Sequence, residues 1–214
     1  MNYFAHGRSS LDRPWVLAGT ALPDWLRIAD RRARLREEHL VAWTDPRGAQ
    51  MATGVRCHLA EDRVFHQAPT FVALCRRITD DLRGLDPLPR FRSSVVAHVL
   101  VEMLLDAALD AAEPGAFGRY YEALEGIEVA GLVEPVERAL GPEVATRLGE
   151  AFERFRRSRF LPSYRTDQGM IGSLAGVMRR VPLGPLPDRF PERLPDYRRW
   201  VALDAVQLMA EVRP

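Results

Sequence analysis

The sequence predicts an all-α protein, a single-domain helical bundle of about eight or nine helices that spans residues 1–214. Apolar residues recur with the helical period along the chain, and no segment has the alternating pattern of a strand bounded by turn signals. No internal repeat points to a solenoid. At 47% hydrophobic and 28% charged residues, the composition is that of an ordinary globular protein with one sizeable core.

Four helices are expected in the first half of the chain, each ended by a turn signal. Asp24 can cap a helix over residues 25–43, which ends at the turn Asp45-Pro46-Arg47-Gly48. The next helices are expected over residues 50–66, 70–84 and Ser93 to Ala112, the last two separated by a loop at 85–91.

The second half continues with helical segments over residues 117–127, 134–140 and 142–160. Pro162 breaks the last of these, and a further helix begins at residue 163. The Pro-rich connection 182–197, PLGPLPDRFPERLPDY, leads to a final helix over 197–212. This connection is either a lid or a plain linker, because its composition is compatible with both.

Composition and charge narrow the partners and the compartment. The net charge is +1, so no strong field favours binding to nucleic acid or to an anionic membrane. Cys57 and Cys75 match no zinc or redox spacing and indicate buried thiols in a reducing compartment. The N-terminal residues lack a secretory apolar core, and no run approaches the roughly 18 apolar residues of a membrane span. We expect a cytoplasmic protein without a membrane span and leave its oligomeric state open.

The stretch AHVLVEMLLD places three ionisable side chains in a segment suited to a core. His98, Glu102 and Asp106 are four residues apart, so they share one stripe of a helix that is apolar nearly all round. An unpaired buried carboxylate costs several kcal/mol, so Glu102 and Asp106 must meet a cation, a metal or a proton.

The stretch HLAEDRVFH repeats this spacing with His58, Asp62 and His66. Two such helices can face one another and converge on an ion, since imidazole and carboxylate together suit zinc, manganese or iron. The stripe of His58, Asp62 and His66 is equally compatible with a solvated helix face. The stripe of His98, Glu102 and Asp106 is also compatible with buried ion pairs that set helix register.

Five stretches of the chain together resemble the acyl carrier protein phosphodiesterase family. They are MNYFAH, LAGTALPDWL, GVRCHLAEDRVFHQAP, VEMLLDAAL and SYRTDQGMIGSLAGVMRR, in this order over residues 1 to 182. The resemblance implies an all-helical, HD-like, metal-dependent phosphodiesterase, with manganese, that acts on the phosphopantetheine ester of an acyl carrier protein. It implies matching polar positions at His6, Asp24, His58, Asp62 and Asp106, with Glu102 in place of an Asp.

The chain also departs from this family. Leu59 and Ala107 stand where the family has polar residues, and His66 and His98 stand where it has an Asp and a non-ligand residue. A weaker likeness is to zinc-dependent phospholipase C-like proteins.

The resulting hypothesis is a metal-dependent phosphohydrolase or phosphodiesterase acting on a phosphate ester. Glu102 is expected to act as general base or to orient a ligand of the metal. Tyr164 and Arg165 are expected to bind the phosphate, and the alternative for Arg165 is a surface ion pair. The expected metal ligands are His6, Asp24, His58, Asp62, His66, His98 and Asp106. The alternative is a non-catalytic helical protein that keeps the family framework and binds a ligand or a partner.

Overall fold

The computed structural model describes residues 1–85, 92–180 and 184–212, and it confirms the all-α class. These residues form eleven α-helices and two short 3-10 helices, with no strand among them, so the helix count exceeds the expected eight or nine. Contacts divide the chain into two compact units. Unit 1 comprises Met1–Asn2, Asp62–Pro114 and Phe160–Pro214, and unit 2 comprises Tyr3–Glu61 and Gly115–Arg159.

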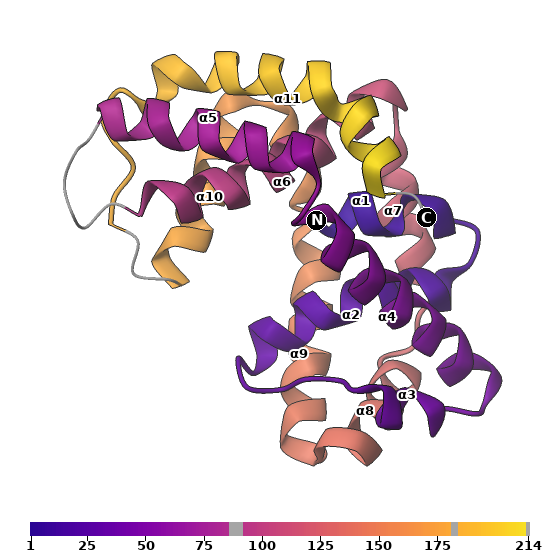
Figure 1. Ribbon diagram of the computed structural model, residues 1–214. Coiled ribbons are helices and arrows are strands. Elements are labelled where there is room, and N and C mark those ends of the chain that lie inside the picture. Colours follow the sequence, from indigo (N-terminus) through magenta and orange to yellow (C-terminus); the bar gives the residue numbers. More distant parts are fainter. Residues whose placement is uncertain (86–91, 181–183, 213–214) are drawn as a thin grey trace. The chain divides into compact units, whose positions relative to one another are not determined.

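Unit 2 is built around α2, which packs against α9 through large aromatic side chains. Trp25 of α2 lies 5.0 Å from Phe152 and 5.3 Å from Phe155, measured between ring centroids. α8 also packs against α9, as Figure 1 shows. The helices of unit 2 are α1 (Tyr3–Gly7), α2 (Pro14–Ala29), α3 (Glu37–Val41), most of α4 (Pro46–Phe65), α7 (Ala116–Glu125), α8 (Val129–Leu140) and α9 (Pro142–Ser158).

Two glycines let the backbones of α2 and α4 touch. A Cβ atom on Gly19 would lie 2.2 Å from the Met51 carbonyl oxygen, and one on Gly54 would lie 2.1 Å from the Val16 carbonyl oxygen. Real Cβ atoms do not approach carbonyl oxygens this closely, so only glycine allows the crossing. The crossing brings the following turn of α4, which carries His58, against α2.

Unit 1 is a packed group of helices with α6 at its centre. Figure 1 shows α5 and α11 side by side, and α6 contacts both of them as well as α10. Most of the circumference of α6 is buried, as its apolar sequence predicts, whereas His98 and Glu102 lie on a stripe that is only partly buried. The helices are α5 (Pro69–Leu85), α6 (Ser93–Ala112), the 3-10 helix η2 (Leu161–Arg165), α10 (Asp167–Arg180) and α11 (Phe190–Val212).

The prediction of a helix over residues 25–43 is wrong. α2 instead runs from Pro14 to Ala29, and Asp24 lies inside it rather than at its N-cap. Pro14 occupies the first turn of α2, where the missing proline N–H would have no helical partner. The helix therefore begins ten residues before Asp24, the residue expected to cap it. The helix ends at Ala29, and Asp30 is its C-cap. The Asp30 side chain accepts a hydrogen bond from the Arg32 amide, a local turn that does not continue the helix.

The turn Asp45-Pro46-Arg47-Gly48 begins α4 and does not end the preceding helix. The Asp45 carboxylate accepts hydrogen bonds from the amides of Arg47 at 3.1 Å and Gly48 at 2.9 Å. These are the bonds of a helix cap, and Pro46 in the first turn needs no partner for its nitrogen.

The final helix begins at Phe190, seven residues before the expected start at Tyr197. Pro191 and Pro195 fall in its first two turns, where proline is better tolerated than in a helix interior. The Pro-rich connection is therefore shorter than 182–197. Its residues 182–183, and all but the first residue of the loop expected at 85–91, lie outside the described residues.

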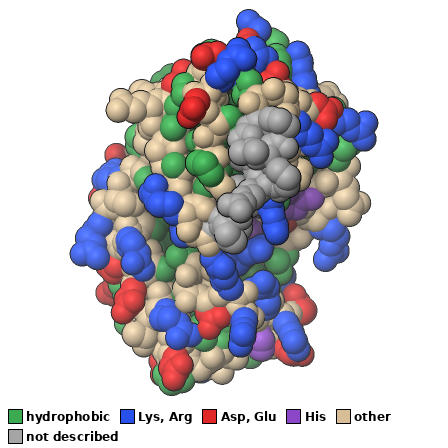
Figure 2. Space-filling model, turned by 90° about the vertical axis from the view of Figure 1, so that its left-hand side faces the viewer, with side chains coloured by type: hydrophobic (Ala, Val, Ile, Leu, Met, Phe, Trp, Pro, Cys, Tyr) green, Lys and Arg blue, Asp and Glu red, His purple; other side chains and the backbone are tan. Residues whose placement is uncertain are grey.

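The surface carries charges of both signs, as expected from a net charge of +1. Figure 2 shows Arg side chains spread over one face with Asp and Glu among them. Within the described part of the chain, no helix is both long and apolar enough to cross a membrane.

Candidate metal centres

His6 and His58 form a buried, stacked pair in unit 2. His6 is 1% exposed and His58 is 4% exposed. The centroids of their rings lie 4.0 Å apart, and the ring planes are inclined by 28°. The short helix α1 presents His6 because Phe4 is packed edge-on against Phe117 of α7 at 5.2 Å. Two adjacent imidazoles would repel one another if both were protonated, so this arrangement favours at least one neutral ring.

Both rings are held by the same nitrogen, Nδ1. His58 Nδ1 lies 2.8 Å from the carbonyl oxygen of Thr20, and His6 Nδ1 lies 2.7 Å from a carboxylate oxygen of Glu61. A carbonyl oxygen can only accept, so Nδ1 of His58 is the donor, and the lone pair of a neutral ring is on Nε2. Metal-binding histidines use this arrangement, in which one ring N–H is anchored and the other nitrogen is a ligand.

The fold supplies the two anchors from neighbouring helices. Glu61 lies three residues after His58 on α4, so both side chains project from similar faces of the helix. Thr20 lies in α2 at the close crossing with α4. Pro23, three residues later, has no N–H, so the Gly19 carbonyl at this crossing lacks its usual helical hydrogen bond. The glycine contact between α2 and α4 therefore also sets the distance from His58 to its acceptor.

A second group lies wholly in unit 1 and consists of His66, His98 and Glu102, here called the His66–His98–Glu102 cluster. His98 and Glu102 are one turn apart on α6, and His66 follows the last residue of α4. Nε2 of each histidine lies 3.2 Å from the same oxygen, Oε1 of Glu102. The donor atoms of the three residues all lie within 4.8 Å of one another.

Glu102 carries a negative charge in a buried position. Burial by itself would raise its pKa, but the Met1 amine and the hydrogen bonds from His66 and His98 outweigh burial and hold the pKa well below the ordinary range. The Met1 amine lies 3.3 Å from Glu102 and 2.6 Å from Asp62. A carboxylate held at so low a pKa is a weak proton acceptor, so this environment does not support the expected role of Glu102 as general base.

The remaining expected ligands are Asp24, Asp62 and Asp106. Asp106 is fully buried on α6, one turn after Glu102. Asp62 follows His58 by one turn of α4 and is the first helical residue assigned to unit 1. Asp24 is half-buried inside α2.

Tyr164 and Arg165, the expected phosphate-binding residues, have protein partners in unit 1. Asn2 donates a hydrogen bond of 3.3 Å to the Tyr164 hydroxyl. Arg165 binds both oxygens of the buried Asp110, with Nε–Oδ2 at 2.7 Å and Nη2–Oδ1 at 3.0 Å. A substrate phosphate would have to compete with this carboxylate for the guanidinium.

Sequence reasoning missed the anchors Thr20 and Glu61, and it missed Asp110. Asp110 continues the four-residue spacing of His98, Glu102 and Asp106, so extending that series by one turn would have found it. Glu61 is the neighbour of the expected ligand Asp62, and its position three residues after His58 was a usable signal. The Thr20 anchor is a backbone carbonyl, which no residue type reveals.

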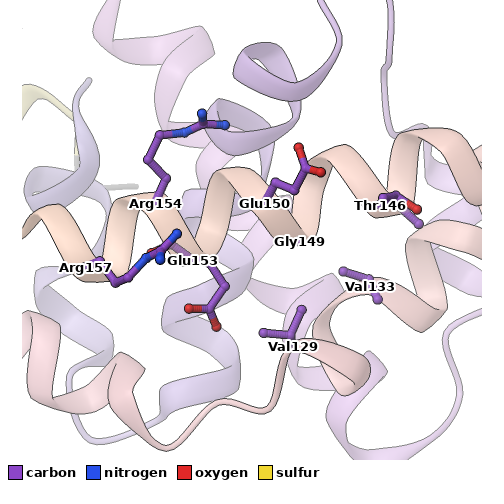
Figure 3. Close-up of a pocket in the computed structure, with 9 residues that line it drawn as sticks. Val129, Val133, Thr146, Gly149, Glu150, Glu153, Arg154 and Arg157 are labelled. Carbon is purple, nitrogen blue, oxygen red and sulfur yellow. The ribbon is translucent and has the colours of Figure 1, made fainter.

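A hollow of about 560 Å³ in unit 2 contains none of these residues. It lies between α8 and α9, and Figure 3 shows Glu153 on the side of α9 where Val129 and Val133 of α8 lie, with Arg154 on the other side. Its walls combine valine side chains with the carboxylates and guanidiniums of Glu150, Glu153, Arg154 and Arg157, so it offers contact area but no imidazole.

No protein-family model, no curated protein and no solved structure matches this chain. Its function is therefore inferred from the geometry of the two groups of side chains, the stacked histidine pair and the His66–His98–Glu102 cluster.

Proposed function

We propose that this chain is a divalent-metal-dependent phosphohydrolase or phosphodiesterase. The observation that carries the proposal is the stacked pair of His6 and His58, two buried imidazoles whose Nδ1 atoms are both anchored to oxygen acceptors. A buried polar side chain needs a partner, and the Thr20 carbonyl leaves the lone pair of a neutral His58 ring on Nε2. The Glu61 carboxylate orients Nε2 of His6 in the same way.

The residues fit a first-row divalent ion. Imidazole nitrogen suits zinc and iron, and added carboxylate oxygen extends the range to manganese. His6 and His58 would hold the ion, while Glu61 and the Thr20 carbonyl keep both rings in the required orientation. Asp24, Asp62 and Asp106, expected from the family resemblance, stay predictions as further ligands.

The chemistry of a bound divalent ion accounts for the reaction class. Such an ion lowers the pKa of a bound water toward about 7 and polarises a phosphoryl oxygen, which makes hydrolysis of a phosphate ester feasible at neutral pH. The chain contributes orientation, because the Nδ1 atoms of both histidines are anchored. The acyl carrier protein expected as substrate is part of this proposal.

Metal content tests the first half of the proposal. Protein purified without chelator should contain stoichiometric zinc, iron or manganese by elemental analysis, and His58→Gln should contain one equivalent less. Glu61→Ala should weaken metal affinity about 10- to 100-fold, because it removes only the anchor of His6. His39→Gln is the matched control, since the His39 ring bonds the Arg36 amide and belongs to neither group. Wild-type protein without bound metal would contradict the mechanism.

Hydrolysis tests the second half. The metal-loaded protein should hydrolyse bis-p-nitrophenyl phosphate, and metal removal or His58→Gln should abolish turnover. Release of phosphopantetheine from a holo-acyl carrier protein should depend on the same residue. Turnover of the model ester without release from the carrier protein would keep the reaction class and exclude that substrate.

A non-catalytic ligand-binding protein is the second candidate function, and one observation favours it. The hollow between α8 and α9 is lined by Val129, Val133 and charged side chains and includes none of the expected catalytic residues. This candidate requires that no divalent ion restores hydrolysis of any phosphate ester, so metal-restored turnover would exclude it.

A further inference from the structure

The His66–His98–Glu102 cluster is complete within unit 1. Two of its donors are one turn apart on the buried helix α6, and the third follows α4 at the start of the turn that leads to α5. No residue of unit 2 is needed to assemble these three donor atoms. The cluster can thus be judged as a site in its own right.

The spacing of the donors matches the edges of a coordination shell. Zinc binds imidazole nitrogen and carboxylate oxygen at about 2.0–2.1 Å in a tetrahedral arrangement, which places neighbouring ligand atoms about 3.3 Å apart. Both Nε2 atoms lie 3.2 Å from Oε1 of Glu102. The same distances suit hydrogen bonds from protonated rings, so the test has to separate a metal site from a charge cluster.

The surroundings fix both rings and favour a cation. The rings of His66 and His98 lie 4.9 Å apart at 30°, and the Phe71 ring packs edge-on against both, at 5.6 Å and 5.1 Å. Glu102 is largely buried, with a side chain 17% exposed, and it already faces the positive amine of Met1. A metal ion bound by the two histidines would therefore have to compete with the Met1 amine for Oε1 of Glu102.

We infer that His66, His98 and Glu102 bind one late first-row divalent cation of the zinc type through two imidazole nitrogens and one carboxylate oxygen. This ion is additional to the one proposed at His6 and His58 and does not depend on it. Three protein ligands leave a fourth position of a tetrahedral shell open, which is the pattern of exchangeable rather than closed zinc sites. The histidine side chains are 37% and 41% exposed, so an ion has a path from solvent.

Cobalt titration of the full-length protein tests the site. Metal-free protein is titrated with Co²⁺ while its visible absorption is recorded, because tetrahedral Co²⁺ with nitrogen and oxygen ligands absorbs far more strongly than hexaaqua Co²⁺. His58→Gln serves as background, since it removes the other proposed ion. This variant should still bind one equivalent of Co²⁺, and the double variant His58→Gln/His98→Gln should bind at least 100-fold more weakly.

Two further variants keep the test independent of folding. His66→Gln changes a half-exposed side chain and should weaken binding as His98→Gln does, whereas His39→Gln should not. Melting temperatures measured without metal show whether each variant is folded. In the His58→Gln background, Zn²⁺ should raise the melting temperature only of variants that keep the cluster. Identical Co²⁺ titrations with and without His66 and His98 would overturn the inference, whatever the outcome for hydrolysis.

Discussion

Asp110 shows how a single residue in the polar stripe of α6 is used structurally. Its side chain is 4% exposed, and Arg165 binds both of its oxygens. Arg165→Ala removes the guanidinium from a buried carboxylate, and we expect a loss of about 1–3 kcal/mol in the free energy of unfolding, because the Arg165 side chain is itself 47% exposed. Arg189→Ala is the matched control, because the Arg189–Glu192 pair is exposed and contributes less than about 1 kcal/mol. Urea denaturation compares the two, and equal losses would contradict a special role for Arg165.

Asp81 couples stability to pH. The hydrogen bonds from Arg193 lower its pKa below the ordinary 3.8, burial opposes this, and the Tyr197 hydroxyl lowers it further. A carboxyl whose pKa is lower in the folded state stabilises the fold above the unfolded value, and this contribution is lost as the pH falls through the folded pKa. Asp81→Asn should lower the free energy of unfolding at pH 7 by about 1–2 kcal/mol. The gap from wild type should narrow below pH 4 in urea denaturation at several pH values.

At this scale the sequence indicated the residue types but not their roles. Four-residue spacing pointed to His98, Glu102 and His66, which the structure brings together in one cluster. It could not show that His58 is anchored by a carbonyl of another helix, because backbone acceptors have no residue signature. Nor could it show the low pKa of Glu102, which depends on the amine of a distant residue.

Among the elements, the close crossing of α2 and α4 decides the geometry around His58. Gly54→Ala would place a methyl group 2.1 Å from the Val16 carbonyl oxygen, so the helices must separate. We expect a cost of about 1–3 kcal/mol from this overpacking, although alanine is the better helix former. Gly172→Ala in α10 is the control, because nothing lies within 4 Å of its added methyl, and it should stabilise by up to about 1 kcal/mol. Thermal melting of both variants checks the opposite signs.

Helix prediction succeeded where the pattern was local. The bounds of α6 agree with the expected Ser93 to Ala112, since an apolar run between turn signals leaves little freedom. It failed around Asp24 and Tyr197, because a proline in the first turns of a helix looks the same in sequence as one that breaks a helix. Pro14, Pro191 and Pro195 all lie in the first two turns of their helices, where a proline removes few or no backbone hydrogen bonds.

For the whole molecule, the order of segments decides which parts can fold alone. Unit 2 ends at Arg159, whereas unit 1 needs the segment after it, because α11 covers α5 and α6. A chain ending at Arg159 should therefore retain protected amides in α2, α8 and α9 and lose protection in α5 and α6. Hydrogen exchange with mass spectrometry distinguishes this from uniform loss, which would mean that the units do not fold separately.

The hydrogen bond from His58 to Thr20 gives the protein a built-in spectroscopic reporter. Imidazole N–H protons in water exchange too quickly to be observed, but this one is buried and bound to a carbonyl. Its signal should therefore appear far downfield of the amide protons in a proton NMR spectrum recorded in water, and persist at neutral pH. Because the bond spans the crossing of α2 and α4, that one resonance would register any change that separates the two helices.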